Sequence, residues 1–171
     1  MTHTPLKWPA ALALIALLGT LAMPAVAGEK VPFADAPEAV RQTVEREVGR
    51  AVRTLELETF DGQTAYEAEY EVDDVDRGLW VAEDGAVLAR SVEIRVRELP
   101  KAVVDAVLAK YPGAELEEAE RIEMASPAGT ATQPAEVRYE VEIEIERNGR
   151  DIERELIVTA DGDILSDELD D

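Results

Sequence analysis

Apolar and polar residues alternate with a period of two over several stretches of the chain. The clearest is residues 137–145, where every second residue is Val, Tyr or Ile and the others are Arg or Glu. Residues 66–72 and 55–57 show the same alternation. This period predicts antiparallel strands with one buried face and one solvated face. We therefore expect the glutamates between the apolar residues to point to solvent.

Two other stretches have the apolar spacing of helices. Val40, Val44 and Val48 are four residues apart, and the stretch lies between Pro37 and Gly49. This spacing gives one apolar stripe along a helix, which predicts a helix that packs on a sheet. A second helix is predicted from Pro100 onwards, because proline suits the first turn of a helix and several apolar residues follow it at helical spacing.

Three landmarks occur twice in the same order along the chain. Pro37 and Pro100 each precede an Ala-Val pair at the start of a predicted helix. A Tyr-Glu-x-Glu sequence begins at Tyr66 and again at Tyr139, and an Asp-Gly turn follows each of them between two strand patterns. Such ordered similarity indicates an internal duplication.

These patterns predict an α+β fold of two tandem repeats. Each repeat is expected to be a helix packed on an antiparallel sheet of about three to four strands. We place the first repeat at residues 28–96 and the second at residues 97–171, which ends in an acidic tail. Whether the two repeats share one sheet is left open by the sequence.

Four motifs of the second copy together resemble PepSY-like domains. They are Pro-x-Ala-Val at residues 100–103, Tyr-Pro-Gly-Ala at 111–114, Tyr-Glu-x-Glu at 139–142 and Asp-Gly-x-x-Leu at 161–165. The first copy departs from the family at residues 48–51, where Val-Gly-Arg-Ala replaces Tyr-Pro-Gly-Ala.

The resemblance implies an exported bacterial protein that binds or inhibits a partner and has no catalytic residues to carry over. A tandem pair also looks like the arrangement of the secreted β-lactamase-inhibitor protein. That likeness is an analogy of fold, and a fold alone does not give a function.

The first 27 residues are typical of a cleaved secretory signal. Lys7 precedes a short apolar run, which Pro24 and the small residues Ala25 and Ala27 follow. A membrane-spanning helix needs a longer uninterrupted run. We therefore expect cleavage after Ala27, a periplasmic or secreted location, and no stable membrane insertion of the remaining chain.

The composition excludes several classes of function. The net charge is −21, so nucleic acids and anionic lipid surfaces would be repelled, while a protein or peptide with a basic surface would be attracted. The chain has no cysteine, and its single histidine, His3, lies in the segment expected to be removed. Nucleophilic triads and histidine-based zinc sites are therefore excluded, and we predict a non-enzymatic binding module without a cofactor.

The solvated sheet face carries the candidate binding residues. Trp80 and Ile157 have the parity of the glutamates rather than that of the core residues beside them. Trp80 is either an anchor for a protein partner or a residue covered by another part of the chain. The predicted partner-binding set is Trp80, Ile157, Glu67, Glu69, Glu71, Glu140, Glu142 and Glu144.

Cation binding, with calcium as the candidate ion, is the alternative function. Asp73, Asp74 and Asp76 lie in a turn expected to extend from Asp73 to Gly78, and aspartates in a turn can ligate calcium. The other candidate, Asp161-Gly162-Asp163, departs from the calcium-loop spacing of EF-hands because Leu165 follows.

Overall fold

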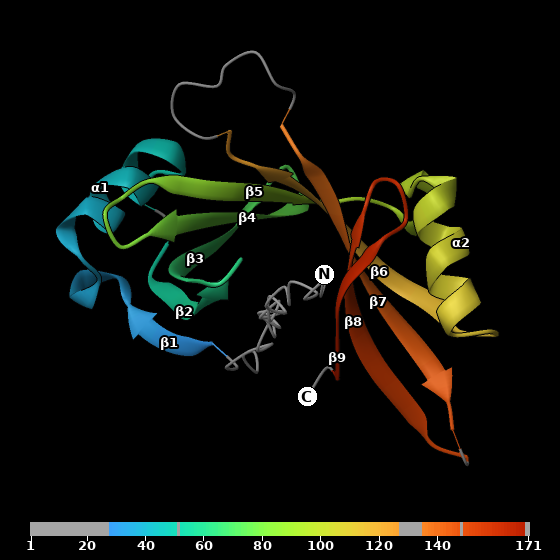
Figure 1. Ribbon diagram of the computed structural model, residues 1–171. Helices are drawn as coiled ribbons and strands as arrows, with labels where there is room; N and C mark the ends of the chain where they lie inside the picture. Colours follow the sequence, from blue (N-terminus) through green and yellow to red (C-terminus); the bar gives the residue numbers. More distant parts are fainter. Residues whose placement is uncertain (1–27, 51, 127–134, 148, 170–171) are drawn as a thin grey trace, which may run out of the picture.

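A single antiparallel sheet forms most of the protein in the computed structural model, which describes residues 28–50, 52–126, 135–147 and 149–169. The nine strands lie side by side in chain order (Figure 1). They are β1 (Glu29–Pro32), β2 (Thr54–Phe60), β3 (Gln63–Val72), β4 (Val75–Ala82), β5 (Val87–Glu93), β6 (Glu115–Met124), β7 (Val137–Glu146), β8 (Asp151–Thr159) and β9 (Ile164–Leu169). Two helices, α1 (Glu38–Glu47) and α2 (Lys101–Lys110), and two single turns of 3₁₀ helix, η1 (Phe33–Asp35) and η2 (Val96–Glu98), complete the described part.

The predicted fold class of two tandem repeats, each a helix on its own small sheet, is wrong. Strands β5 and β6 pair from Ala89↔Met124 to Glu93↔Glu120, so one sheet runs through the predicted boundary between residues 96 and 97. The sequence pattern is local and reports only which face of a strand is apolar. It gives no sign of which strands pair, because pairing is made by backbone groups that every residue carries.

Tight turns join neighbouring strands. Asp73 and Asp74 have φ angles of 56° and 60°, and Val72 pairs with Val75 directly across them. Two residues with positive φ form the type of turn whose twist matches that of a hairpin. The turn is therefore two residues long, shorter than the predicted turn from Asp73 to Gly78, and Asp76 belongs to β4.

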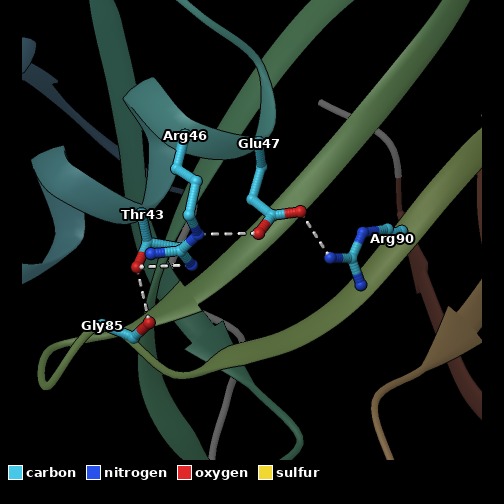
Figure 2. A network of polar contacts seen from close by, with 5 residues as sticks. All are labelled: Thr43, Arg46, Glu47, Gly85 and Arg90. Carbon is cyan, nitrogen blue, oxygen red and sulfur yellow. Dashed lines mark hydrogen bonds and ion pairs between the residues drawn. The ribbon is translucent and has the colours of Figure 1, made fainter.

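Helix α1 lies at the left of Figure 1 and covers one face of the sheet. Val40 and Val44 are fully buried against Leu55, Leu79 and Val81. Polar contacts fix the same helix (Figure 2): the hydroxyl of Thr43 donates a hydrogen bond of 2.8 Å to the carbonyl of Gly85. Arg90 on β5 donates to Glu47 at 2.7 Å, and this bond is the main cause that lowers the pKa of Glu47.

Helix α2 lies at the opposite end of the molecule and covers the same face of the sheet (Figure 1). Val103 and Val107 pack with Val141, Leu156 and Val158, all of them fully buried. The end of α2 is fixed by Asp167 on β9, which accepts hydrogen bonds from Tyr111 and Arg154 at 2.7 Å and pairs with Lys110. Burial by itself would raise the pKa of Asp167, but these three partners outweigh it and lower the pKa.

Both helices thus lie on one face, which we call the helix-covered face. Among the described residues, neither helix is long and apolar enough to cross a lipid bilayer. The predicted signal segment, residues 1–27, lies outside the described residues. The opposite face of the sheet has no helix on it, and its side chains form the candidate site.

Candidate functional site

The strand register collects acidic side chains on the face opposite the helices. Trp80 pairs with Glu67, and Glu140 pairs with Ile157, so residues of this parity share one side of the sheet. We call this side the acidic face. Its acidic residues in the strand ladders include Glu56, Glu58, Glu67, Glu69, Glu71, Asp76, Glu93, Glu115, Glu120, Glu140, Glu142, Glu144, Glu153, Glu155 and Glu168.

Acidic residues stand directly opposite one another across several pairs of strands. Such pairs include Glu56↔Glu67, Glu71↔Asp76, Glu120↔Glu140, Glu142↔Glu155 and Glu144↔Glu153. Like charges in direct register destabilise a sheet. A face built this way costs stability, so the folding of the chain does not explain it.

Few basic side chains share this face. Among the strand residues that the structure describes, only Lys30 and Arg138 have the register of the acidic face. Arg138 is already paired with Glu136 at 2.8 Å and with Asp61 at 3.1 Å. The acidic face therefore has a large excess of carboxylates over cations.

Two glutamates of the face are held largely in their protonated form at neutral pH. Burial is the largest cause that raises the pKa of Glu67 to about 9, followed by the charges of Glu58, Glu69, Glu140 and Glu120. A buried carboxylate loses hydration and a nearby carboxylate repels it, so both effects favour the neutral acid.

Glu140 on β7 has the same property for the same reasons. Burial is the largest cause that raises its pKa to about 9, followed by the charges of Glu155, Glu120 and Glu142. Glu67 and Glu140 are four strands apart, yet the charge of Glu140 is one of the causes that raise the pKa of Glu67. The pKa of Glu140 is itself raised. The face thus behaves as one electrostatic cluster.

Glu58 and Glu120 extend the cluster. Burial is the main cause that raises the pKa of each of them. A hydrogen bond from the indole N–H of Trp80 partly offsets this effect for Glu58. The two residues complete a set of four glutamates, on β2, β3, β6 and β7, whose pKa values are raised together.

The expectation that the strand glutamates point freely to solvent is wrong for part of the set. Glu67, Glu140, Glu142 and Glu144 are half-buried, whereas Glu69 and Glu71 are exposed, as expected. Glu69 and Glu71 lie closer to the β3–β4 turn than Glu67 does. Glu67 and Glu140 lie in the middle of their strands among large side chains.

Trp80 lies on the acidic face but does not project from it. Its side chain is 5% exposed, stacks on Phe60 with 4.9 Å between the ring centroids, and donates its indole N–H to Glu58. It packs with Ala65, Ala89 and Ile122, with Ile157 at the margin of the same cluster. Of the two alternatives, the structure places Trp80 as a covered residue that forms the floor of the face.

The lack of a side chain at Gly78 leaves space for the ring of Trp80. A Cβ atom at position 78 would lie 3.0 Å from the tip of the Trp80 ring, 3.0 Å from the carboxylate of Glu67 and 2.6 Å from the hydroxyl of Ser91. A side chain at this position would therefore force the hydroxyl of Ser91 to move and would press on the Trp80 ring and the carboxylate of Glu67. Position 78 thus lies where the ring of Trp80 meets the carboxylate of Glu67.

A hollow of about 120 Å³ opens on this face between β4 and β7. Its lining is acidic apart from one alanine, and consists of Asp76, Glu93, Glu118, Ala119, Glu120, Glu140 and Glu142. The β6 strand has an irregularity between Leu116 and Ala119, next to the hollow. Bulges of this kind redirect side chains, here that of Glu118.

The predicted cation ligands are not gathered into a metal-binding group. Asp73, Asp74 and Asp76 are exposed at the β3–β4 turn. The group of acids close enough to share an ion within the described residues is Glu115, Glu117 and Glu144, whose carboxylate oxygens lie within 4.8 Å of one another. Of these three residues, only Glu144 belonged to a predicted site, and that site was the partner-binding one.

The sequence prediction missed several residues of the cluster. Glu58, Glu93, Glu118 and Glu120 were not singled out, although they carry or border the most strongly perturbed carboxyls. The parity of Glu58 within residues 54–60 was a usable signal. Glu93 and Glu120 could not have been found in this way, because their position depends on the pairing of β5 with β6.

Comparison with solved structures gives matches of low sequence identity to proteins of Bacteroides species. A protein of Bacteroides eggerthii DSM 20697 described as periplasmic has a TM-score of 0.51 at 15% identity, over 78% of this chain and 88% of its own. A DUF2874 family protein of Bacteroides uniformis ATCC 8492 has the same TM-score and identity, over 78% of this chain and 89% of its own. This likeness shows the fold.

A BLIP-like protein of Bacteroides fragilis NCTC 9343 aligns over 78% of this chain and 86% of its own, at 15% identity. Its TM-score is 0.46. No family model matches the chain, and a search of curated proteins found no significant match. The resemblance to PepSY-like domains is not shown by any of these comparisons and stays a prediction from the motifs.

Proposed function

We propose that the chain is an exported, non-enzymatic binding module whose acidic face holds a basic segment of a partner protein or peptide. The observation that carries this proposal is the excess of carboxylates on one face of the sheet, with Lys30 and Arg138 as the basic strand residues there. A surface of one sign steers a partner of opposite sign and fixes its orientation.

The arrangement of the face supports a macromolecular partner with several positive charges. The acids extend over the strands from β2 to β9 and do not surround a single closed cavity. The hollow lined by Asp76, Glu93, Glu120 and Glu140 has the size of one side chain. An arginine or lysine side chain could enter it while the neighbouring acids meet further charges of the partner.

Glu67 and Glu140 do not form an acid–base pair with each other, which favours binding over catalysis at these two residues. Catalysis by two carboxyls needs their pKa values to be pushed apart, so that one is an acid while the other is a base. On the acidic face the pKa values of Glu67 and Glu140 are both raised to about 9. A non-enzymatic function therefore remains our prediction.

Export is supported by two separate observations. Residues 1–27 have the pattern of a cleaved secretory signal. One of the proteins with a similar fold is described as periplasmic. We propose a periplasmic or secreted location, where a partner with a basic surface would meet the acidic face.

Binding can be measured with the exported form of the protein, purified from the periplasm. Trp8 belongs to the predicted signal, so that Trp80 would be the single tryptophan after cleavage and its fluorescence would report on the face itself. The probe is a short peptide of alternating arginine and alanine, and the matching peptide of glutamate and alanine is the negative control. We expect saturable binding of the arginine peptide that weakens steeply as salt is added.

A matched pair of variants tests whether the peptide binds on the acidic face. Glu120→Gln removes one charge from the hollow, and Glu83→Gln removes one charge from the exposed β4–β5 turn. We expect Glu120→Gln to weaken binding by about fivefold, equivalent to about 1 kcal/mol, and Glu83→Gln to leave it nearly unchanged. Equal effects of the two variants would mean that net charge alone attracts the peptide, and the proposed site would be wrong.

A further inference from the structure

Glu67 and Glu140 are surrounded by acids from every strand that packs around them on this face. Glu58 on β2, Glu69 on β3 and Glu120 on β6 act on Glu67, and Glu142 on β7 and Glu155 on β8 act on Glu140. Glu56 on β2 stands opposite Glu67, and Asp76 on β4 and Glu93 on β5 line the hollow beside Glu140. The basic groups nearest by register are Lys30, which stands opposite Glu56 in the row of Glu67, and Arg138 beside Glu140, which is paired with Asp61 and Glu136.

This geometry makes full ionisation of the face costly in the free protein. Glu67, Glu120 and Glu140 are half-buried, and each stands opposite another acid in direct register, as Glu140 meets Glu120. The cost falls when a proton is bound. A bound external cation would also lower the cost of ionisation, because the cation, like the proton, supplies the missing positive charge.

We infer that the acidic face exchanges protons for its partner: Glu67 and Glu140 hold protons in the free protein and release them when a cationic side chain docks beside them. This inference rests on the proposed function. Each exchange converts one carboxylic acid into a carboxylate and transfers one proton to the solvent. No other bond is formed or broken.

The direct consequence is that the partner binds more tightly as the pH rises. The pKa values of about 9 keep both groups protonated at neutral pH, and binding of a cation favours the ionised form. By linkage, each proton released makes the affinity rise by about tenfold per pH unit while the group is protonated in the free protein and ionised in the complex. An arginine probe keeps its own charge throughout this interval, so the pH dependence belongs to the protein.

The test counts the protons. Calorimetric titration with the arginine–alanine peptide in two buffers of different ionisation enthalpy gives the number of protons released on binding. We expect a release of one to two protons per complex at about pH 7.5 and an affinity that rises between about pH 6 and pH 8. In the variant Glu67→Gln/Glu140→Gln we expect the release to fall close to zero, whereas Glu83→Gln should keep it.

A second measurement needs no partner. Carbon-13 NMR of the side-chain carboxyls in the free protein follows each glutamate through its titration, and Glu67→Gln and Glu140→Gln assign the two signals. We expect two glutamates to titrate several units above the ordinary range of about 4.3. If every glutamate titrates below about pH 6, the inference is overturned while the proposed function stands.

The remaining outcomes separate the two proposals. Binding of the peptide with equal affinity at all pH values and without proton release would also overturn the inference alone. Failure of the peptide to bind at any pH and low salt would overturn the proposed function and the inference with it. Retained proton release in the double glutamine variant would assign the exchange to other groups and would contradict the inference.

Discussion

Alternate residues of the same strands form the two faces of the sheet, and the two faces have opposite effects on stability. On the helix-covered face, Leu79, Val81, Val141 and Leu156 are almost completely buried under α1 and α2. On the acidic face, the residues between them are mostly carboxylates with no helix above them. The first face stabilises the fold by removing apolar surface from water. The second face destabilises the fold because its carboxylates repel one another, and a cationic partner can reduce this repulsion.

The largest effect is expected on the helix-covered face. Leu156 has no exposed surface and lies under α2 in the core formed with Val103 and Val107. The change Leu156→Ala leaves a cavity and should reduce the free energy of unfolding by about 3 kcal/mol. Urea denaturation measures it. Glu153→Ala, on the exposed side of the same strand, should change stability by less than about 0.5 kcal/mol. Similar losses in both variants would contradict the difference between the faces.

The next effect sharpens the role of the aromatic floor. Gly78→Ala would place a methyl group against Trp80, Glu67 and Ser91, at distances of 2.6–3.0 Å. We expect a loss of about 2 kcal/mol, because an overpacked site must shift its neighbours. The fluorescence of Trp80 should move to longer wavelength as the indole is displaced towards water. Loss of stability with an unchanged emission spectrum would show that the indole does not lie across Gly78.

The stability of the free protein should fall as the pH rises. The ordinary pKa of a glutamate is 4.5 and that of Glu67 is raised to about 9, so the folded state holds a proton that the unfolded chain has lost between these values. Stability contributed by such a group is complete below the lower value and disappears as the pH approaches the upper one.

Glutamine at position 67 should reduce this dependence and leave the part that Glu140 contributes. At about pH 8 we expect Glu67→Gln to be more stable than the original chain by about 1 kcal/mol, and at about pH 5 to be equal to it. Glu83→Gln is the control and should keep the original pH profile. Urea midpoints at the two pH values measure the effect, and a variant less stable than the original at the higher pH would contradict the raised pKa.

The smallest effect concerns the polar attachment of α1. Thr43 is buried and donates to the carbonyl of Gly85 at 2.8 Å, and Val at this position has nearly the same shape. Thr43→Val should lower the stability by about 1 kcal/mol, since the carbonyl loses its partner. Thermal unfolding monitored by circular dichroism would detect the change, and peptide binding should be unaffected. A change in binding would mean that the two faces are not independent.

The sequence predicted the local elements better than their assembly. The alternation in residues 137–145 and the prolines before the two helices gave β7, α1 and α2 at their observed places. The predicted fold of two tandem repeats, each a helix on a sheet of about three to four strands, was wrong because the nine strands form one sheet. The pairing of Ala89 with Met124 depends on backbone hydrogen bonds, which residue types do not reveal.

Part of the candidate site could be predicted, because the parity of a residue along a strand determines the face on which it lies. The parity of Glu67, Glu140, Trp80 and Ile157 placed them on one face, as the register has them. The perturbed pKa values could not be predicted, because they depend on burial and on the meeting of Glu120 with Glu140. A carboxylate in a row looks the same in a sequence whether it is solvated or crowded.

The most direct test of the account is to map which face meets a cationic partner. Backbone and side-chain NMR signals of the exported protein can be followed while the arginine–alanine peptide is added. The account predicts the largest shifts on the acidic face, at Glu67, Ser91, Glu120, Glu140 and Ile157, with little change at Val40, Val44, Val103 or Val107 under the helices. Shifts concentrated on α1 or α2, with the acidic face silent, would contradict it.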